Sequence, residues 1–273
     1  MNYTLDFVIH PKFSDRDGKL GKRINSAADD AAGLAVANKM TSQMLGMRTA
    51  IRNTQDGISL VQTAESSMNE INNMILRMRE LAVQSANGTL TDGDRAHTDA
   101  EFDQLVAEVT RIANNTTWAG KKLINGDHAS TALSFQIGEG ANQTIDVNIA
   151  DMKATALGAE TVSNGTDIPA LSAAGLDSLT NAQLAIQSID NAIDSVSTAR
   201  GGMGAVSNRL SSTMSNLDQI AINLSASQGR IQDADFAQET GNLAKNQILQ
   251  QAATAMIAQA NASKSSVLTL VRG

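Results

Sequence analysis

The residues best suited to chemistry are three histidines and two acidic clusters. His10, His97 and His128 lie far apart, and none has a second histidine four residues along a helix, the spacing that suits a metal ion. We therefore interpret them as surface residues. Asp29-Asp30 and Asp233-Ala234-Asp235 each stand where a helix is predicted to begin. Stabilisation of the helix dipole explains both clusters better than acid–base catalysis.

Other signatures of catalysis are also weak. The run Gly201-Gly202-Met203-Gly204 follows no predicted strand and lacks the lysine and hydroxyl residue of a phosphate-binding loop, so a tight contact between helices explains it better. No serine lies in a G-x-S-x-G motif. The absence of cysteine excludes disulfides, cysteine-ligated zinc and cysteine nucleophiles. We expect no catalytic residue, no cofactor and no metal site, and so a structural or interaction protein that is not an enzyme.

Composition points to long helices. The chain has 273 residues, a net charge of -7, 3% aromatic residues and two prolines, which is typical of helices packed through small side chains. The acidic balance argues against nucleic-acid binding. No apolar run reaches the roughly 18 residues of a membrane span. The first residues also lack the apolar core of a signal peptide.

The first half of the chain carries apolar residues at helical spacing. We predict one long helix from Ala28 to about Gln84, with Asn25 and Ser26 as cap residues and Asp29-Asp30 in its first turn. A turn at 87–94 and a second helix ending near Ala119-Gly120 follow. The stripe of the long helix includes Met47, Val61, Met68, Ile75 and Ala82, and that of the second includes Phe102, Leu105, Val109 and Ile112.

The middle of the chain changes its period to two. Apolar and polar residues alternate on both sides of 138–142, which predicts a β-hairpin. Residues 152–176 are rich in alanine, serine, threonine and glycine and contain Pro169, so we interpret them as a small, irregular outer segment. The alternating residues are Leu133, Phe135, Ile137, Ile145, Val147 and Ile149.

The second half returns to a seven-residue repeat. Such a repeat predicts helices wound together with a left-handed twist. We expect a bend near 228–230 and a last helix from about Ala234. The repeat consists of Ile189, Val196, Met203, Leu210, Leu217 and Leu224.

These patterns predict a mainly α protein, a long antiparallel helical rod or coiled-coil bundle with a β-hairpin and a small irregular outer segment at its far end. We divide the chain into five parts. They are an atypical leader (1–21), amino-terminal core helices (22–129), a hairpin with a short variable outer segment (130–178), a carboxy-terminal core helix (179–228) and a terminal coiled-coil helix (229–273).

Several long motifs, in the right order, resemble bacterial flagellin. Residues 23–36 and 78–89 resemble its amino-terminal signatures, and residues 205–210, 230–237 and 267–273 resemble its carboxy-terminal ones. The resemblance implies an extracellular subunit of the flagellar filament that serves motility and is exported unfolded by the flagellar type III route. It also implies that the terminal helices pair as a coiled coil. The implied partners are other flagellin subunits and the flagellar cap, junction and export-chaperone proteins.

Two alternatives to a filament subunit remain open. One is the hook–filament junction protein, which shares these terminal helices. The other is a flagellin-like surface adhesin or glycan-binding protein that uses residues 152–176. That segment offers no aromatic platform for a sugar.

The resemblance also implies a receptor contact. Flagellins recognised by a Toll-like innate receptor present an arginine and its neighbours on this helix. The alternative is that Ile75 and Leu81 are buried and Arg77 is an ordinary surface charge. The matching positions are Ile75, Arg77, Leu81, Gln84 and Glu108.

Residues 1–21 depart from the family pattern. A flagellin has a longer amphipathic helix here, whereas this chain has Pro11, which would break a helix, among Tyr3, Phe7 and Phe13. We interpret the segment as a replaced or vector-derived leader on a truncated flagellin, and the alternative is a natural variant start. The last helix then lacks a partner, which predicts a monomer that polymerises poorly.

Overall fold

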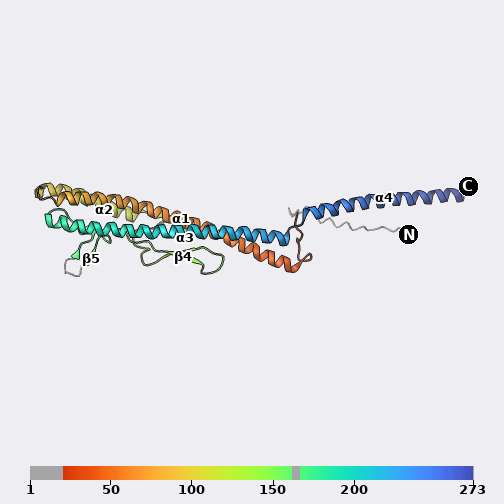
Figure 1. Ribbon diagram of the computed structural model, residues 1–273, viewed down its shortest axis with the longest axis horizontal. Coiled ribbons are helices and arrows are strands. Elements are labelled where there is room, and N and C mark those ends of the chain that lie inside the picture. The colour runs from red at the N-terminus through yellow and green to blue at the C-terminus, as the bar shows by residue number, and fades with distance from the viewer. Residues whose placement is uncertain (1–20, 162–166, 273) are drawn as a thin grey trace. The chain divides into compact units, whose positions relative to one another are not determined.

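The computed structural model describes residues 21–161 and 167–272 (Figure 1). The predicted leader therefore lies outside the described residues, apart from Gly21. The chain divides into two compact units. One comprises residues 43–222, and the other combines the residues up to 42 with those from 223 onward.

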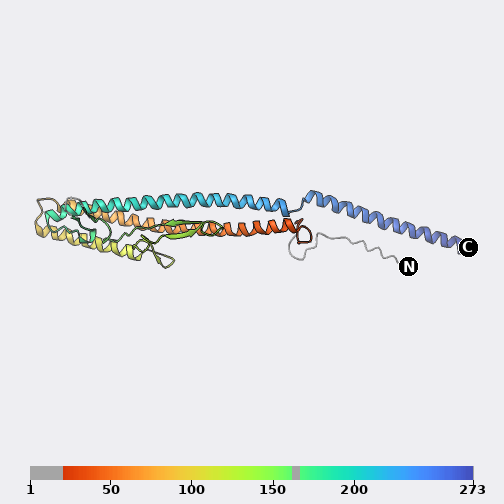
Figure 2. The same cartoon turned by 90° about the horizontal axis from the view of Figure 1, so that it is seen from below.

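Four long helices dominate, as the sequence predicted. They are α1 (Ala31–Ser85), α2 (Asp92–Asn115), α3 (Leu179–Gln232) and α4 (Phe236–Arg272). In the unit of residues 43–222, α1 and α3 lie side by side in opposite directions with α2 beside them (Figures 1 and 2).

The described part of the chain has three two-stranded antiparallel sheets, all in the sequence between α2 and α3. The strands are β1 (Thr117–Trp118) with β2 (Lys121–Lys122), β3 (Leu133–Gln136) with β4 (Thr144–Val147), and β5 (Glu160–Thr161) with β6 (Asp167–Ile168). The β3–β4 pair is the predicted hairpin, with Leu133 opposite Val147 and Phe135 opposite Ile145.

The core of the unit of residues 43–222 consists of the predicted stripes. The α1 stripe packs with apolar residues of α2 and with the seven-residue repeat of α3, in which Ile189, Val196 and Leu210 are completely buried. Residues 152–176 form only short elements, yet their apolar side chains contribute to this core. The buried ones include Met152, Leu157, Leu171 and Leu176.

The predicted start of the first long helix is wrong. The helix begins at Ala31, because the Asp30 carboxylate accepts the Gly33 N–H at 2.9 Å and so acts as the cap residue. Asp29 lies before the helix, and its carboxylate accepts the backbone N–H groups of Asn25 and Ser26 at 3.1 and 3.0 Å. The acidic pair thus organises the turn before the helix.

The predicted end of the second helix is also wrong. α2 ends at Asn115, four residues before Ala119-Gly120. Those two residues have φ of 49° and 80° and connect β1 to β2, where a two-residue hairpin turn requires positive φ. Ala119-Gly120 therefore forms a hairpin turn and not the predicted helix cap.

The β3–β4 hairpin lies along α1 rather than at the far end of the bundle (Figure 2). A Cβ built on Gly46 would lie 3.0 Å from Glu139, and one on Gly57 would lie 3.3 Å from Phe135. The two glycines thus remove bulk where the hairpin approaches. Asn53 fixes the contact by donating to the Gln136 carbonyl at 3.2 Å.

The second unit joins the start of the described chain to the α3–α4 connection. The Arg23 N–H donates to the Gln232 carbonyl at 2.7 Å, and the Ala234 N–H donates to the Gly21 carbonyl at 2.8 Å. α3 therefore ends at Gln232, slightly beyond the predicted bend. Asp235 then starts α4 by accepting the Ala237 N–H at 2.9 Å.

α4 differs from the other long helices in its burial. Its large apolar side chains, as far as the described residues extend, are exposed to solvent. They are Phe236, Leu243, Ile248, Leu249, Met256 and Ile257.

Candidate functional site

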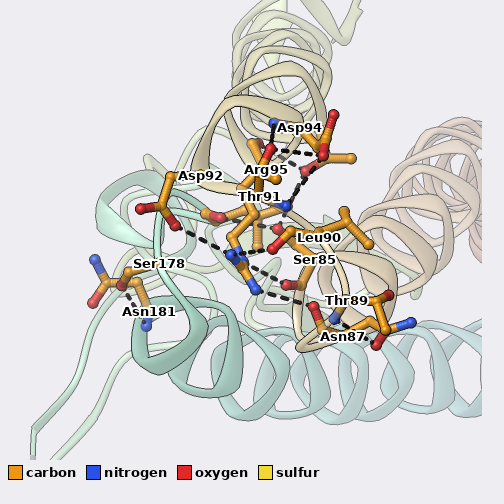
Figure 3. A network of polar contacts seen from close by, with 12 residues as sticks. Ser85, Asn87, Thr89, Leu90, Thr91, Asp92, Asp94, Arg95, Ser178 and Asn181 are labelled. Atoms are coloured by element: carbon orange, nitrogen blue, oxygen red, sulfur yellow. Dashed lines mark hydrogen bonds and ion pairs between the residues drawn. The ribbon is translucent and has the colours of Figure 1, made fainter.

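Most of the predicted receptor residues lie on the last turns of α1, beside α2. The connection between these helices is held by Arg95, whose side chain is only 7% exposed. Figure 3 shows its guanidinium among the carbonyls of the turn. It donates to the carbonyl oxygens of Ser85, Leu90 and Asn87 at 3.0, 2.9 and 3.0 Å, and to the Asp92 carboxylate at 3.2 Å.

This arrangement satisfies groups that the end of a helix leaves open. The last carbonyls of α1 have no partner within the helix, and a planar guanidinium can bond several of them at once. The Ser85 hydroxyl donates to the Leu176 carbonyl at 2.9 Å and accepts from Thr98 at 3.2 Å. The turn is thus bound to α2 and to the segment before α3.

A capping box starts α2. The Asp94 N–H donates to the Thr91 hydroxyl at 3.3 Å, and the Thr91 N–H donates back to the Asp94 carboxylate at 3.1 Å. The Thr91 hydroxyl also donates to that carboxylate at 2.7 Å. These hydrogen bonds hold the pKa of Asp94 below its ordinary value, and the bond from the Thr91 hydroxyl is the largest cause.

Ion pairs cross the surface of the same region. Arg77 on α1 donates to Glu80 at 2.8 Å and to Glu101 of α2 at 2.9 Å. These contacts, with Glu80 the larger cause, raise the pKa of Arg77. Arg79 donates to Asp190 of α3 at 2.7 Å, which raises the pKa of Arg79.

The structure separates the predicted receptor residues into two groups. Ile75 and Leu81 are buried in the core, whereas Arg77 and Gln84 are exposed. Glu108 pairs with Arg111, which lowers the pKa of Glu108. The acidic residue that α2 brings to Arg77 is therefore Glu101 and not Glu108.

Two residues that organise this region were missed in the sequence. Glu101 carries no local signal, because its partner lies on another helix. The capping box was visible as a threonine three residues before an aspartate, and Arg95 directly follows it. That spacing could have placed Arg95 on the first turn of a helix, close to the preceding turn.

The residues first considered for chemistry lie apart from this region. His97 is exposed, and the His128 Nδ1 lies 3.3 Å from the Thr131 carbonyl oxygen, while His10 is outside the described residues. In the described parts of the chain, no three histidine, aspartate or glutamate side chains are grouped to hold a metal ion. No described helix is long and apolar enough to cross a membrane.

The predicted tight contact at the glycine run of α3 is wrong for this chain. A Cβ added to Gly201, Gly202 or Gly204 would meet no described atom within 4 Å. The glycines therefore make no room for another element among the described residues.

Family models match both ends of the chain. Residues 20–129 match the bacterial flagellin N-terminal helical region, and residues 186–271 match the bacterial flagellin C-terminal helical region. The chain belongs to the bacterial flagellin family. As a flagellin, it is a structural subunit of the flagellar filament at the cell surface, and it assembles with further copies of itself.

Individual proteins agree with this assignment. A flagellin from Halalkalibacterium halodurans is 42% identical over 92% of this flagellin and 88% of its own length. The crystal structure of Bacillus cereus flagellin is 29% identical, with a TM-score of 0.50, over 61% of this chain and 88% of that one. A protein described as flagellar hook-associated, from Vibrio parahaemolyticus, gives a TM-score of 0.56 over 75% of this chain and all of its own. At 16% identity, that likeness shows a shared fold alone.

Proposed function

We propose that this flagellin polymerises through its terminal helices, with α4 as a principal contact between subunits. The observation that supports this most is the exposure of Phe236 and Met256, at 70% and 72%. Contiguous apolar side chains left in water mark an interaction surface. A helix with such a surface gains most of its stability from packing. Helices of neighbouring subunits would supply that packing in a filament.

Seeded elongation tests this proposal. Sheared filaments are mixed with the chain, and growth is followed by negative-stain electron microscopy. Ile248→Asp places a charge among the apolar residues of α4, whereas Gln247→Asp changes its exposed neighbour and serves as control. Residues 1–21 predict poor polymerisation, whereas membership of the flagellin family favours growth. On the family's side, we expect growth with the unchanged chain and with Gln247→Asp, and little or none with Ile248→Asp. Equal growth of both variants would exclude α4 as a principal contact.

We also infer a structural role without enzymatic activity, and export by the flagellar type III route. Family membership supports both, as it supports contacts with the cap, junction and export-chaperone proteins. Deletion of the flagellar export gate in a host that expresses the chain tests the route. Secretion that persists in that strain would contradict it.

Recognition by a Toll-like innate receptor is a further proposal. Arg77 supports it, because its side chain is half exposed and is held in place by Glu80 and Glu101. Exposed Gln84 lies two turns further along α1. Buried Ile75 and Leu81 would act only by supporting this surface.

A reporter assay for receptor signalling tests this contact. Arg77→Asp should reduce the signal strongly, because it reverses the exposed charge. Arg52→Asp is the matched control, since Arg52 is an exposed arginine earlier on α1 that contacts none of the predicted receptor residues. Unchanged signalling by Arg77→Asp, or an equal loss in both variants, would contradict the assignment.

A further inference from the structure

A groove of about 490 Å³ runs beside the glycine run of α3. One wall is the helix itself, with Ala199, Gly202 and Met203. The facing wall comes from β4 and the residues after it, with Asp146, Asn148 and Asp151. All of these residues belong to the unit of residues 43–222.

The glycines beside this groove are costly for the helix. Each glycine within a helix lowers its stability by about 1 kcal/mol relative to alanine. No described atom lies within 4 Å of a Cβ added to Gly202, so packing inside the chain does not explain the residue. A group that approaches the helix from another molecule would explain it.

The charge of the groove indicates which group fits. Asp151 is compensated, because its carboxylate lies 3.3 Å from the Lys153 ammonium. Asp146 accepts a hydrogen bond from the Ser134 hydroxyl and has no cationic partner among the described residues. The groove therefore favours a cationic side chain that can also contact apolar surface.

The β1–β2 hairpin carries such side chains. Lys121 and Lys122 are exposed beside its tight turn, and neither has an ion-pair partner in the described part of the chain. The next two residues, Leu123 and Ile124, are completely buried, and the Ile124 carbonyl accepts the Met152 N–H at 2.9 Å. The two lysines thus project from a fixed base.

We propose that the β1–β2 hairpin of one subunit docks Lys122 in the α3 groove of a second copy of this chain. This inference rests on the proposed assembly into a filament. Hairpin and groove are different surfaces of one molecule, and the hairpin does not line its own groove. A contact between two different surfaces is head-to-tail, and it builds an open helical filament when its rotation does not close into a ring.

A charge exchange tests the pairing. Lys122→Glu places a negative charge opposite the acidic groove, and Asp146→Lys makes the groove repel the hairpin. Each variant alone should elongate seeds about tenfold more slowly than the unchanged chain, since like charges oppose docking. An equimolar mixture should recover, because every hairpin then finds a groove of opposite charge. Arg209→Glu changes an exposed charge elsewhere on α3, outside the groove, and should elongate seeds at the rate of the unchanged chain.

A second pair of variants separates docking from folding. Gly202→Leu and Gly201→Leu both remove a helix glycine, and both should raise the midpoint of urea unfolding. Only Gly202 lines the groove, so only Gly202→Leu should slow elongation. Equal elongation of these two variants, or a charge-exchange mixture no faster than its components, would overturn the docking.

A failure of the proposed polymerisation can be distinguished from a failure of the proposed docking. If the unchanged chain does not elongate seeds, the proposed polymerisation fails, and the docking is judged by cross-linking in concentrated solution. The chain has no cysteine, so Lys122→Cys mixed with Asp146→Cys reports on this contact alone. A mixed disulfide dimer that makes up clearly more than the half of all dimers given by random pairing supports the docking. A random distribution of the three dimers contradicts it.

Discussion

Helices α3 and α4 have similar apolar content and opposite burial. In α3 the side chain of Ile189 is completely buried, whereas in α4 that of Ile248 is 64% exposed. α3 meets its partners within the chain, because α1, α2 and the intervening hairpins supply them. An apolar stripe therefore indicates that a helix packs against a partner. It does not show whether that partner lies in the same chain or in another molecule.

The largest expected effect comes from a matched pair of truncations. Ile189→Ala removes buried methyl groups and should lower the free energy of unfolding by about 2–5 kcal/mol. Ile248→Ala removes the same atoms from an exposed site and should change it by less than about 0.5 kcal/mol. Urea unfolding of the dilute monomer measures both. A large loss in Ile248→Ala would mean that α4 is already packed in the monomer.

The second-largest expected loss of stability comes from substitution of Arg95, which binds carbonyls at the end of α1. Arg95→Met keeps a long side chain but leaves the carbonyls of Ser85, Leu90 and Asn87 without their donor. Loss of the donor to one buried and two partly buried acceptors should cost about 1–3 kcal/mol. Arg95→Lys retains the charge without the planar fork and should recover only part of the loss. Hydrogen exchange should locate the change at 85–95, and uniform exchange over both units would contradict a local role.

The sequence was a good guide to long elements and a poor one to their ends. The repeat through Ile189 and Leu210 predicted α3, because burial of one face imposes the helical period on apolar residues. Ala119-Gly120 gave a wrong end for the second helix, because a glycine with positive φ suits both a helix end and a hairpin turn. In the candidate site Arg77 was found by resemblance, but its partner Glu101 depends on the packing of two helices, which no local pattern records.

Two glycines, one packed against α3 and one facing open space, should respond in opposite ways to substitution by alanine. Gly158 has φ of 83°, and a Cβ there would lie 2.6 Å from the Ser188 carbonyl oxygen of α3. Gly158→Ala should therefore cost about 1–3 kcal/mol. Gly201 faces open space, so Gly201→Ala should raise the free energy of unfolding by about 1 kcal/mol. Thermal unfolding measures both, and a loss in Gly201→Ala would reveal a contact inside the chain.

The smallest effect is a pH dependence at the start of α2, which tests whether a helix of the packed unit still depends on its cap. The Thr91 hydroxyl holds the pKa of Asp94 below its unfolded value. The stabilisation is therefore complete above the unfolded pKa and is lost as the pH falls through the folded pKa. The protection factors of the amides at 92–95, relative to the intrinsic exchange rate at each pH, should fall in this window on acidification. Asp94→Asn cannot ionise and should show no such step. A step that persists in this variant would assign the titration to another group, because only the carboxylate of the capping box has been removed.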